Sequence, residues 1–292
     1  MRFIAAAALA AVLVAPRPEP VLAGSSNDGS AMRKSVDLSF GVYQSDKATV
    51  MYRQFSPVIE AIQGAMEKRL SCPVDIQLRI FKSYDEAIEA VVRGEVDFVR
   101  FGPASYVIAK QNEPEIELLA IETENGKRRF EGVFIVAASS PIQKLADLKG
   151  KKFAFGDRNS TIGRYLSQAE LVSAGVTAKD LAGYDYLERH DRVAKAVAVG
   201  DFDAGAVKIE TFEKEKAGGK LRAIGQFENV TKPWFARAGL DADVVKSIRE
   251  ALFALKDPAV LKEIGATGFE PVEDSEYAFV REGMQRALHF DK

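Results

Sequence analysis

A loop of small and polar residues between a predicted strand and a predicted helix is the segment of this chain best suited to chemistry. Its sequence is Gly156-Asp157-Arg158-Asn159-Ser160-Thr161-Ile162-Gly163. The start of a helix leaves backbone N–H groups unpaired and carries the positive end of the helix dipole, and Ser160 and Thr161 add hydroxyl groups. The loop therefore favours a tetrahedral oxyanion, although a well-capped helix alone would also explain it. It lacks P-loop spacing, so nucleotide hydrolysis is not indicated.

A second loop has the same layout of strand, glycine and helix start. It runs Phe101-Gly102-Pro103-Ala104-Ser105-Tyr106, with proline at the first helical position. Ser105 and Tyr106 would add hydroxyl groups to its unpaired N–H groups. Because ligands collect at the carboxyl ends of parallel strands, the two loops predict one shared anion site. The alternative is a simple helix cap with Tyr106 packed in the core.

His190 and Asp203 are the remaining polar candidates. His190 precedes a predicted helix, and Asp203 begins an apolar strand, where a buried carboxylate would need a partner. Together with Ser160 they have the residue types of a hydrolytic triad. Because Ser160 is at a helix cap, and because a fold alone implies no chemistry, an enzyme is not the favoured interpretation.

The periodicity of apolar residues predicts an α/β fold. Alternation with a period of two predicts strands, and spacing of three to four residues predicts helices. The expected strands are 36–42, 74–80, 96–101, 133–137, 153–155, 203–207 and 221–227, and the expected helices are 55–66, 84–93, 161–174, 192–199, 242–255, 258–264 and 275–288. Such alternation is typical of βαβ units and mainly parallel sheets.

Composition narrows the class of protein further. The chain has 292 residues and a formal charge of −2, so no basic field suggests nucleic-acid binding. Residues 1–23 have the layout of a secretory signal peptide cleaved near Ala23, and residues 24–35 predict a disordered arm. The single cysteine, Cys72, is predicted to be an inert buried thiol. With only two histidines beside it, we expect neither a metal site nor a cofactor.

Three ordered segments together resemble the phosphate/phosphite/phosphonate-binding proteins of ABC transporters, which have the type 2 periplasmic binding fold. The segments are Val99 to Val107, Asp147 to Gly163, and His190 to Val207. The resemblance extends from about Val36 to Arg286, nearly all of the chain that follows the predicted signal peptide and arm.

The resemblance implies an α/β protein of two lobes, each a mainly parallel sheet flanked by helices and joined to the other by crossover strands. Lobe 1 would comprise 36–131 and 236–292, and lobe 2 would comprise 132–235. By resemblance, a small oxyanion would be bound without catalysis by Tyr106, Ser160, Thr161, His190 and Asp203, with Tyr43 as the best match for a contact from the first strand. The protein would be a periplasmic monomer that serves a membrane permease.

Two arginines depart from the family pattern, so the identity of the oxyanion is not determined by the resemblance. Arg100 and Arg158 lie beside the two loops, and Ile162-Gly163 follows Thr161 where the family usually has Ser-Gly. A more anionic ligand would fit arginines that point inward. A receptor that feeds a sensor protein and a receptor for a sulfonate or another tetrahedral anion remain alternatives.

Overall fold

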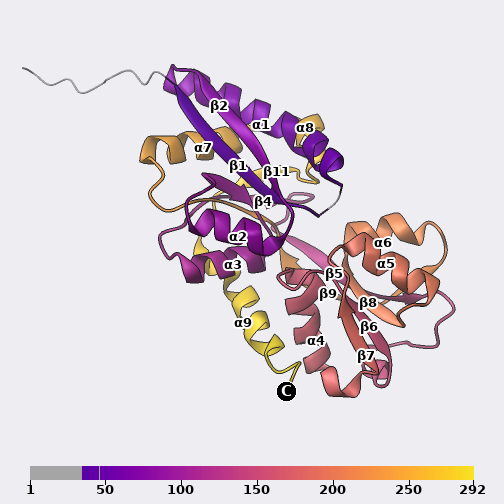
Figure 1. Cartoon of the computed structure of the whole chain (residues 1–292). Coiled ribbons are helices and arrows are strands. Elements are labelled where there is room, and N and C mark those ends of the chain that lie inside the picture. Colours follow the sequence, from indigo (N-terminus) through magenta and orange to yellow (C-terminus); the bar gives the residue numbers. More distant parts are fainter. Residues whose placement is uncertain (1–34, 46) are drawn as a thin grey trace, which may run out of the picture. The chain divides into compact units, whose positions relative to one another are not determined.

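The computed structural model describes residues 35–45 and 47–292. The predicted signal peptide and the predicted arm up to residue 34 lie outside the described residues. Strands and helices alternate from β1 to β4 and again from β6 to β8, as the apolar periodicity predicts. Figure 1 shows two sheets, each with helices packed against it.

The first sheet has six strands in the order β11-β4-β10-β3-β1-β2. Its strands are β1 (Val36–Tyr43), β2 (Val74–Phe81), β3 (Phe98–Arg100), β4 (Glu117–Thr123), β10 (Pro233–Ala236) and β11 (Gly268–Glu270). Strand β1 pairs in parallel with β2 and β3, whereas β10 is antiparallel to both β3 and β4.

The second sheet has five strands in the order β7-β6-β8-β5-β9. Its strands are β5 (Arg129–Ala137), β6 (Lys152–Phe155), β7 (Gly183–Tyr186), β8 (Ala204–Lys208) and β9 (Leu221–Val230). Strand β6 is parallel to β7 and β8, and β5 is antiparallel to β8 and β9. The chain therefore enters this sheet after β4 and returns to the first sheet after β9.

Helices cover both faces of each sheet, so each sheet has two apolar cores. The helices are α1 (Ala48–Leu70), α2 (Tyr84–Val92), α3 (Pro103–Asn112), α4 (Ser167–Ser173), α5 (His190–Val199), α6 (Ile209–Lys216), α7 (Ala242–Ala254), α8 (Pro258–Glu263) and α9 (Ala278–Ala287). Single turns are η1 (Leu145–Leu148), η2 (Thr161–Leu166), η3 (Ala178–Asp180) and η4 (Asp274–Tyr277). Neighbouring strand residues alternate between the cores: Phe98 packs under α1 and α7, and Val99 packs under α2 and α3.

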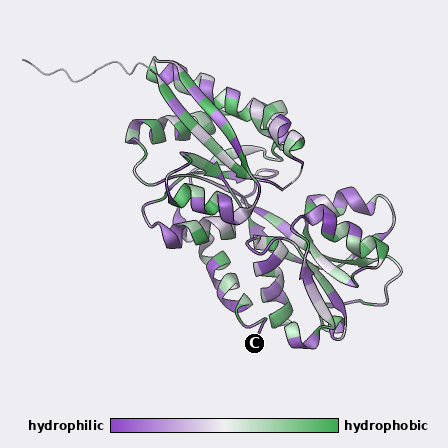
Figure 2. Cartoon of the chain, viewed as in Figure 1, coloured by the Kyte–Doolittle hydropathy of each residue, from purple (hydrophilic) through white to green (hydrophobic). Residues whose placement is uncertain are grey.

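Hydropathy follows this layering. In Figure 2 the strands of both sheets carry much of the green, and helix α6 is mostly purple. Cys72 is buried, as predicted, in the core beneath α1. Among the described residues, none of the helices combines the length and apolar character needed to span a bilayer.

The α/β prediction is confirmed, but both sheets are mixed rather than mainly parallel. Among the described residues, parallel pairing is limited to β1 with β2 and β3, and to β6 with β7 and β8. Strand β10 is not among the expected strands, the last of which is 221–227. Its pairing with β3 and β4 joins segments more than 100 residues apart, and no local period reports such pairing.

Candidate ligand-binding site

A cavity of about 90 Å³ lies where residues from both sheets meet. The side chains that contribute to its wall are Tyr43, Ser45, Met51, Tyr84, Arg100, Phe101, Pro103, Phe130, Ser160, Thr161, Ile162, His190, Lys208, Asn229 and Lys232, with Val42 and Gly102. Tyr43, Arg100 and Lys208 end β1, β3 and β8. The cavity is therefore at the carboxyl ends of the parallel strands. No carboxylate from the described part of the chain lines it.

The Gly156–Gly163 loop supplies one wall through a close contact between its two glycines. Gly156 N–H donates to the carbonyl of Gly163 at 2.8 Å, and a Cβ on either glycine would meet the other backbone at 3.0 Å or less. The closed loop presents Ser160, whose Oγ accepts the N–H of Gly163 at 2.9 Å. Thr161 follows as the first residue of η2, a π-helical turn of the kind that is frequent at functional sites.

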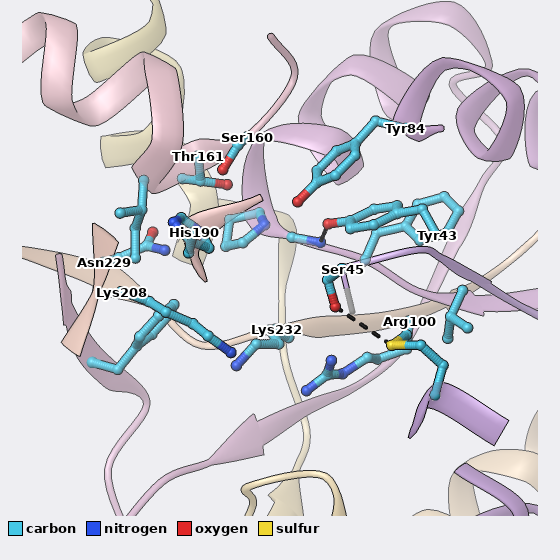
Figure 3. A pocket seen from close by; sticks show the side chains of 17 residues that line it. Tyr43, Ser45, Tyr84, Arg100, Ser160, Thr161, His190, Lys208, Asn229 and Lys232 are labelled. Carbon is cyan, nitrogen blue, oxygen red and sulfur yellow. Dashed lines mark hydrogen bonds between the residues drawn. The ribbon is translucent and has the colours of Figure 1, made fainter. Parts of the chain in front are cut away.

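Tyr43 and Tyr84 form the opposite wall. Their rings stack with centroids 3.6 Å apart, and Tyr43 Oη accepts the N–H of Gly102 at 2.5 Å (Figure 3). Burial raises the pKa of Tyr43, so its phenol stays protonated at neutral pH. A protonated phenol that accepts one hydrogen bond still has its own proton to donate.

His190 and Asn229 present acceptors to the cavity wall. Burial, with help from the nearby ammonium of Lys208, lowers the pKa of His190 to about 4, so the imidazole is neutral at pH 7. Nδ1 of His190 and Oδ1 of Asn229 are buried and have no hydrogen-bond partner within residues 35–45 and 47–292. Two such acceptors would be satisfied by a protonated ligand oxygen or by water.

Three cationic side chains line the other end of the cavity. In Figure 3 the nitrogens of Arg100, Lys208 and Lys232 lie together, apart from the hydroxyl groups of Ser160 and Thr161. Arg100 makes a two-point ion pair with Glu122 at 2.7 and 2.9 Å, and Lys232 lies 2.9 Å from Glu124. Burial acts to raise the pKa of Glu122, but the charge and hydrogen bonds of Arg100, with help from Lys232 and Trp234, hold it below its usual range.

Of the predicted site residues, Tyr43, Ser160, Thr161 and His190 are brought together in this cavity. Ser105 is fully buried beside Tyr43 and does not line it. Tyr106 is also fully buried, and its hydroxyl donates to Asp274 at 2.7 Å. These two positions follow the start of α3 and face the core, so the alternative weighed for Tyr106, packing in the core, is the one that the structure shows.

Asp203 is the clearest correction. Its carboxylate accepts the N–H of Lys152 at 2.8 Å at the amino ends of β6 and β8, whereas the cavity lies at the carboxyl ends. Five residues at a rise of about 3.3 Å separate Asp203 from Lys208, or roughly 16 Å. Arg158 also lies elsewhere, with its guanidinium 4.2 Å from the ring centroid of Tyr186.

Two cavity residues that are absent from the predicted site, Lys208 and Tyr84, follow a recognisable rule. Lys208 directly follows the predicted strand 203–207, and Tyr84 starts the helix after another strand. Residues at those places face the ligand edge of a parallel sheet. Lys232 and Asn229 carry no such signal, because they belong to the antiparallel strand β9 and the link to β10.

The fold and the position of the site define a class of protein. Two mixed sheets flanked by helices, with a cavity between their carboxyl-end loops, are the architecture of a type 2 periplasmic binding protein. A family model described as "ABC transporter, phosphonate, periplasmic substrate-binding protein" matches residues 40–277. The chain belongs to this family, whose members bind a small-molecule substrate for a membrane permease.

Individual relatives agree with this assignment. The chain is 28% identical over 228 residues to the phosphate-import protein PhnD of Mycolicibacterium smegmatis, covering 68% of this chain and 71% of that protein. It is also 28% identical over 170 residues to the probable ABC transporter phosphite binding protein PhnD1 of Prochlorococcus marinus, covering 55% of this chain and only 57% of that protein. The structure of PhnD1 from the same organism in complex with methylphosphonate superposes with a TM-score of 0.76 at 22% identity, over 87% of this chain and 98% of that one.

Proposed function

We propose that this protein binds a phosphonate- or phosphate-like oxyanion in the 90 Å³ cavity and delivers it to the permease of an ABC transporter. One observation carries the proposal: the cavity combines hydroxyl donors from both sheets with three cations and, among the described residues, no lining carboxylate. Hydrogen bonds to a charged group are the strong ones, and an anion is repelled least where no acid faces it.

Four predicted residues would contact the ligand, namely Tyr43, Ser160, Thr161 and His190. Tyr43 donates its phenol proton, and the hydroxyls of Ser160 and Thr161 donate to the oxyanion. The neutral His190 accepts, which suits a ligand that keeps one proton. A P–OH group would pair with Nδ1 of His190, which is buried and otherwise without a partner within residues 35–45 and 47–292.

The protein acts without catalysis in this proposal. A hydrolytic triad of Ser160, His190 and Asp203 would need the carboxylate to orient the imidazole. Asp203 instead lies at the far end of β8, bonded to the backbone of Lys152. The remaining parts of the proposal are two lobes that close on the ligand, cleavage near Ala23, and a monomer that serves a permease rather than a sensor.

A thermal-shift screen tests the proposed function. Phosphate, phosphite, methylphosphonate and methanesulfonate are compared with chloride at equal ionic strength. A ligand at 100 times its Kd stabilises the folded state by about 2.7 kcal/mol, which is easily measured. We expect a phosphorus oxyanion to raise Tm and chloride to leave it unchanged. Stabilisation by no oxyanion, or by the sulfonate alone, would contradict the proposal, and release of phosphate from phosphomonoesters would contradict the absence of catalysis.

A further inference from the structure

Hydroxyl side chains line one end of the cavity, the hydroxyl end, and three cations line the other, the cationic end. A single small oxyanion at the hydroxyl end cannot contact all of this positive charge. Arg100 comes from the end of β3, Lys208 from the end of β8, and Lys232 from the link between β9 and β10. Figure 3 shows their nitrogens pointing toward one another, on the side of the cavity away from Ser160 and Tyr84. The site therefore has two chemically different ends.

The three cations differ in their partners. Arg100 is held by Glu122 and Lys232 by Glu124, the latter at 2.9 Å. Lys208 has no ion pair or hydrogen bond from its ammonium to any residue of the described ranges 35–45 and 47–292. Glu210 attracts it only from a longer range. Burial lowers the pKa of Lys208, and the charge of Lys232 lowers it further. An anion beside Lys208 would relieve both penalties.

A second, larger cavity begins at these cations. It measures about 440 Å³ and shares five wall residues with the first: Ser45, Arg100, His190, Lys208 and Lys232. Its further wall is mixed in charge and includes Arg53, Lys214 and Lys262 together with Glu124, Asp191, Glu210, Glu215 and Glu263. The two cavities therefore adjoin at the three cations, and the larger one offers space for a substituent.

We infer that the preferred ligand is an oxyanion with a second anionic group on a short substituent, and that Lys208 contacts this second group. The inference rests on the proposed function and refines its substrate class. With the phosphonate at the hydroxyl end, a carboxylate or phosphate one or two bonds further on meets Lys208, flanked by Lys232 and Arg100. A carboxylate on the ligand only accepts hydrogen bonds, so it suits these three donors. Among the three, only Lys208 lacks a Glu or Asp partner within the described residues.

The same arrangement selects against cationic substituents. An ammonium group at that position would face three cations, and like charges in a partly desolvated site repel strongly. An aminoalkylphosphonate should therefore bind more weakly than a plain alkylphosphonate. A carboxylate in the site, as the family resemblance implied for Asp203, would favour the opposite order.

Calorimetric titration of three phosphonates tests the inference. The ligands are methylphosphonate, phosphonoacetate and 2-aminoethylphosphonate, at pH 7.5 and 0.15 M salt, with wild type, Lys208→Met and the control Lys195→Met. Lys195 lies on α5, which packs against the sheet that contains Lys208. It is exposed and lines neither cavity, so the control removes an equal charge elsewhere. A hydrogen bond to a charged group corresponds to roughly a tenfold change in Kd or more.

We expect wild type to bind phosphonoacetate about tenfold more tightly than methylphosphonate, and 2-aminoethylphosphonate the least tightly. Lys208→Met should weaken binding of phosphonoacetate about tenfold more than binding of methylphosphonate, while Lys195→Met changes neither ratio. Thermal unfolding checks that each variant folds, and Lys208→Gln repeats the test with a polar side chain.

Two outcomes would overturn the inference while the proposed function survives. In the first, wild type binds methylphosphonate as tightly as phosphonoacetate. In the second, Lys208→Met weakens both ligands equally, which would place the oxyanion itself against Lys208. Binding of none of the three, nor of phosphate or phosphite, would instead remove the proposed function and this inference with it.

Discussion

The backbone N–H of Ala104 donates to Oγ1 of Thr161 at 2.8 Å, across 57 positions of sequence. This bond connects the start of α3, which follows β3 of the first sheet, to the start of η2, which follows β6 of the second. The two loops that the sequence marks as anion-binding candidates are thus in direct contact, and both residues are buried.

Replacing Thr161 by valine, which has the same shape, should destabilise the protein by about 1–3 kcal/mol, because the buried N–H of Ala104 loses its acceptor. Thr161→Ser keeps the hydroxyl and should lose less. Urea unfolding of both variants measures the free energy of unfolding. Equal stability of the valine and serine variants would show that this hydrogen bond contributes nothing.

Removal of the carboxylate that holds Arg100 should be costly. Glu122 is fully buried and also accepts from Trp234 Nε1 at 2.8 Å. We expect Glu122→Gln to lower the free energy of unfolding by roughly 3–5 kcal/mol, because a buried guanidinium is left unbalanced. The matched control is Glu89→Gln on α2, whose pair with Arg93 is exposed and should contribute less than about 0.5 kcal/mol. Similar losses in the two variants would contradict this account of Glu122.

Acidification should destabilise the protein partly through His190. Its pKa of about 4 in the folded state lies below the ordinary value of 6.5, so the unfolded chain binds more protons between these pH values. The stabilisation is complete above pH 6.5 and is lost as pH falls toward 4, at a cost of about 2 kcal/mol between pH 7 and 4.5.

Two histidine variants isolate this effect, because the chain has two histidines and His289 is exposed. Between pH 7 and 4.5, the free energy of unfolding of His190→Gln should fall by about 2 kcal/mol less than that of His289→Gln. Chemical unfolding at both pH values measures the difference. Parallel losses in the two variants would show that His190 titrates normally.

Asp203 should matter for stability and not for the ligand. Asp203→Ala removes the acceptor of the N–H of Lys152 and should destabilise the protein by about 0.5–1.5 kcal/mol. Its affinity for the preferred phosphonate should match that of wild type, because the carboxylate lies at the other end of β8. Titration calorimetry decides the matter, and a tenfold weaker Kd in the variant would return Asp203 to the binding site.

The amino-acid sequence by itself determined the local structure and part of the site. Apolar periods of two and of three to four residues gave the bounds of β1, α1, β2 and α2 to within a few residues except at the start of α1, because each such period reflects burial of one face. The loops after β3 and β6 were recognisable from glycine, proline and hydroxyl residues. Ser160 and Thr161 lie in the cavity, as the place of their loop after a strand predicts, and Tyr43 and His190 lie there as the family resemblance implied.

The tertiary structure decided what depends on long-range pairing and on side-chain direction. Antiparallel β10 inserts between β3 and β4, and the link before it brings Lys232 to Arg100, more than 100 residues away. The carboxyl end of β8 faces the cavity, so Lys208 lines it and Asp203 does not. The site therefore has an ammonium where the sequence predicted a carboxylate. Tyr106 packs in the core because of its direction on α3. Local periodicity records only whether a residue is buried, whereas the charge of this site depends on which distant strands meet.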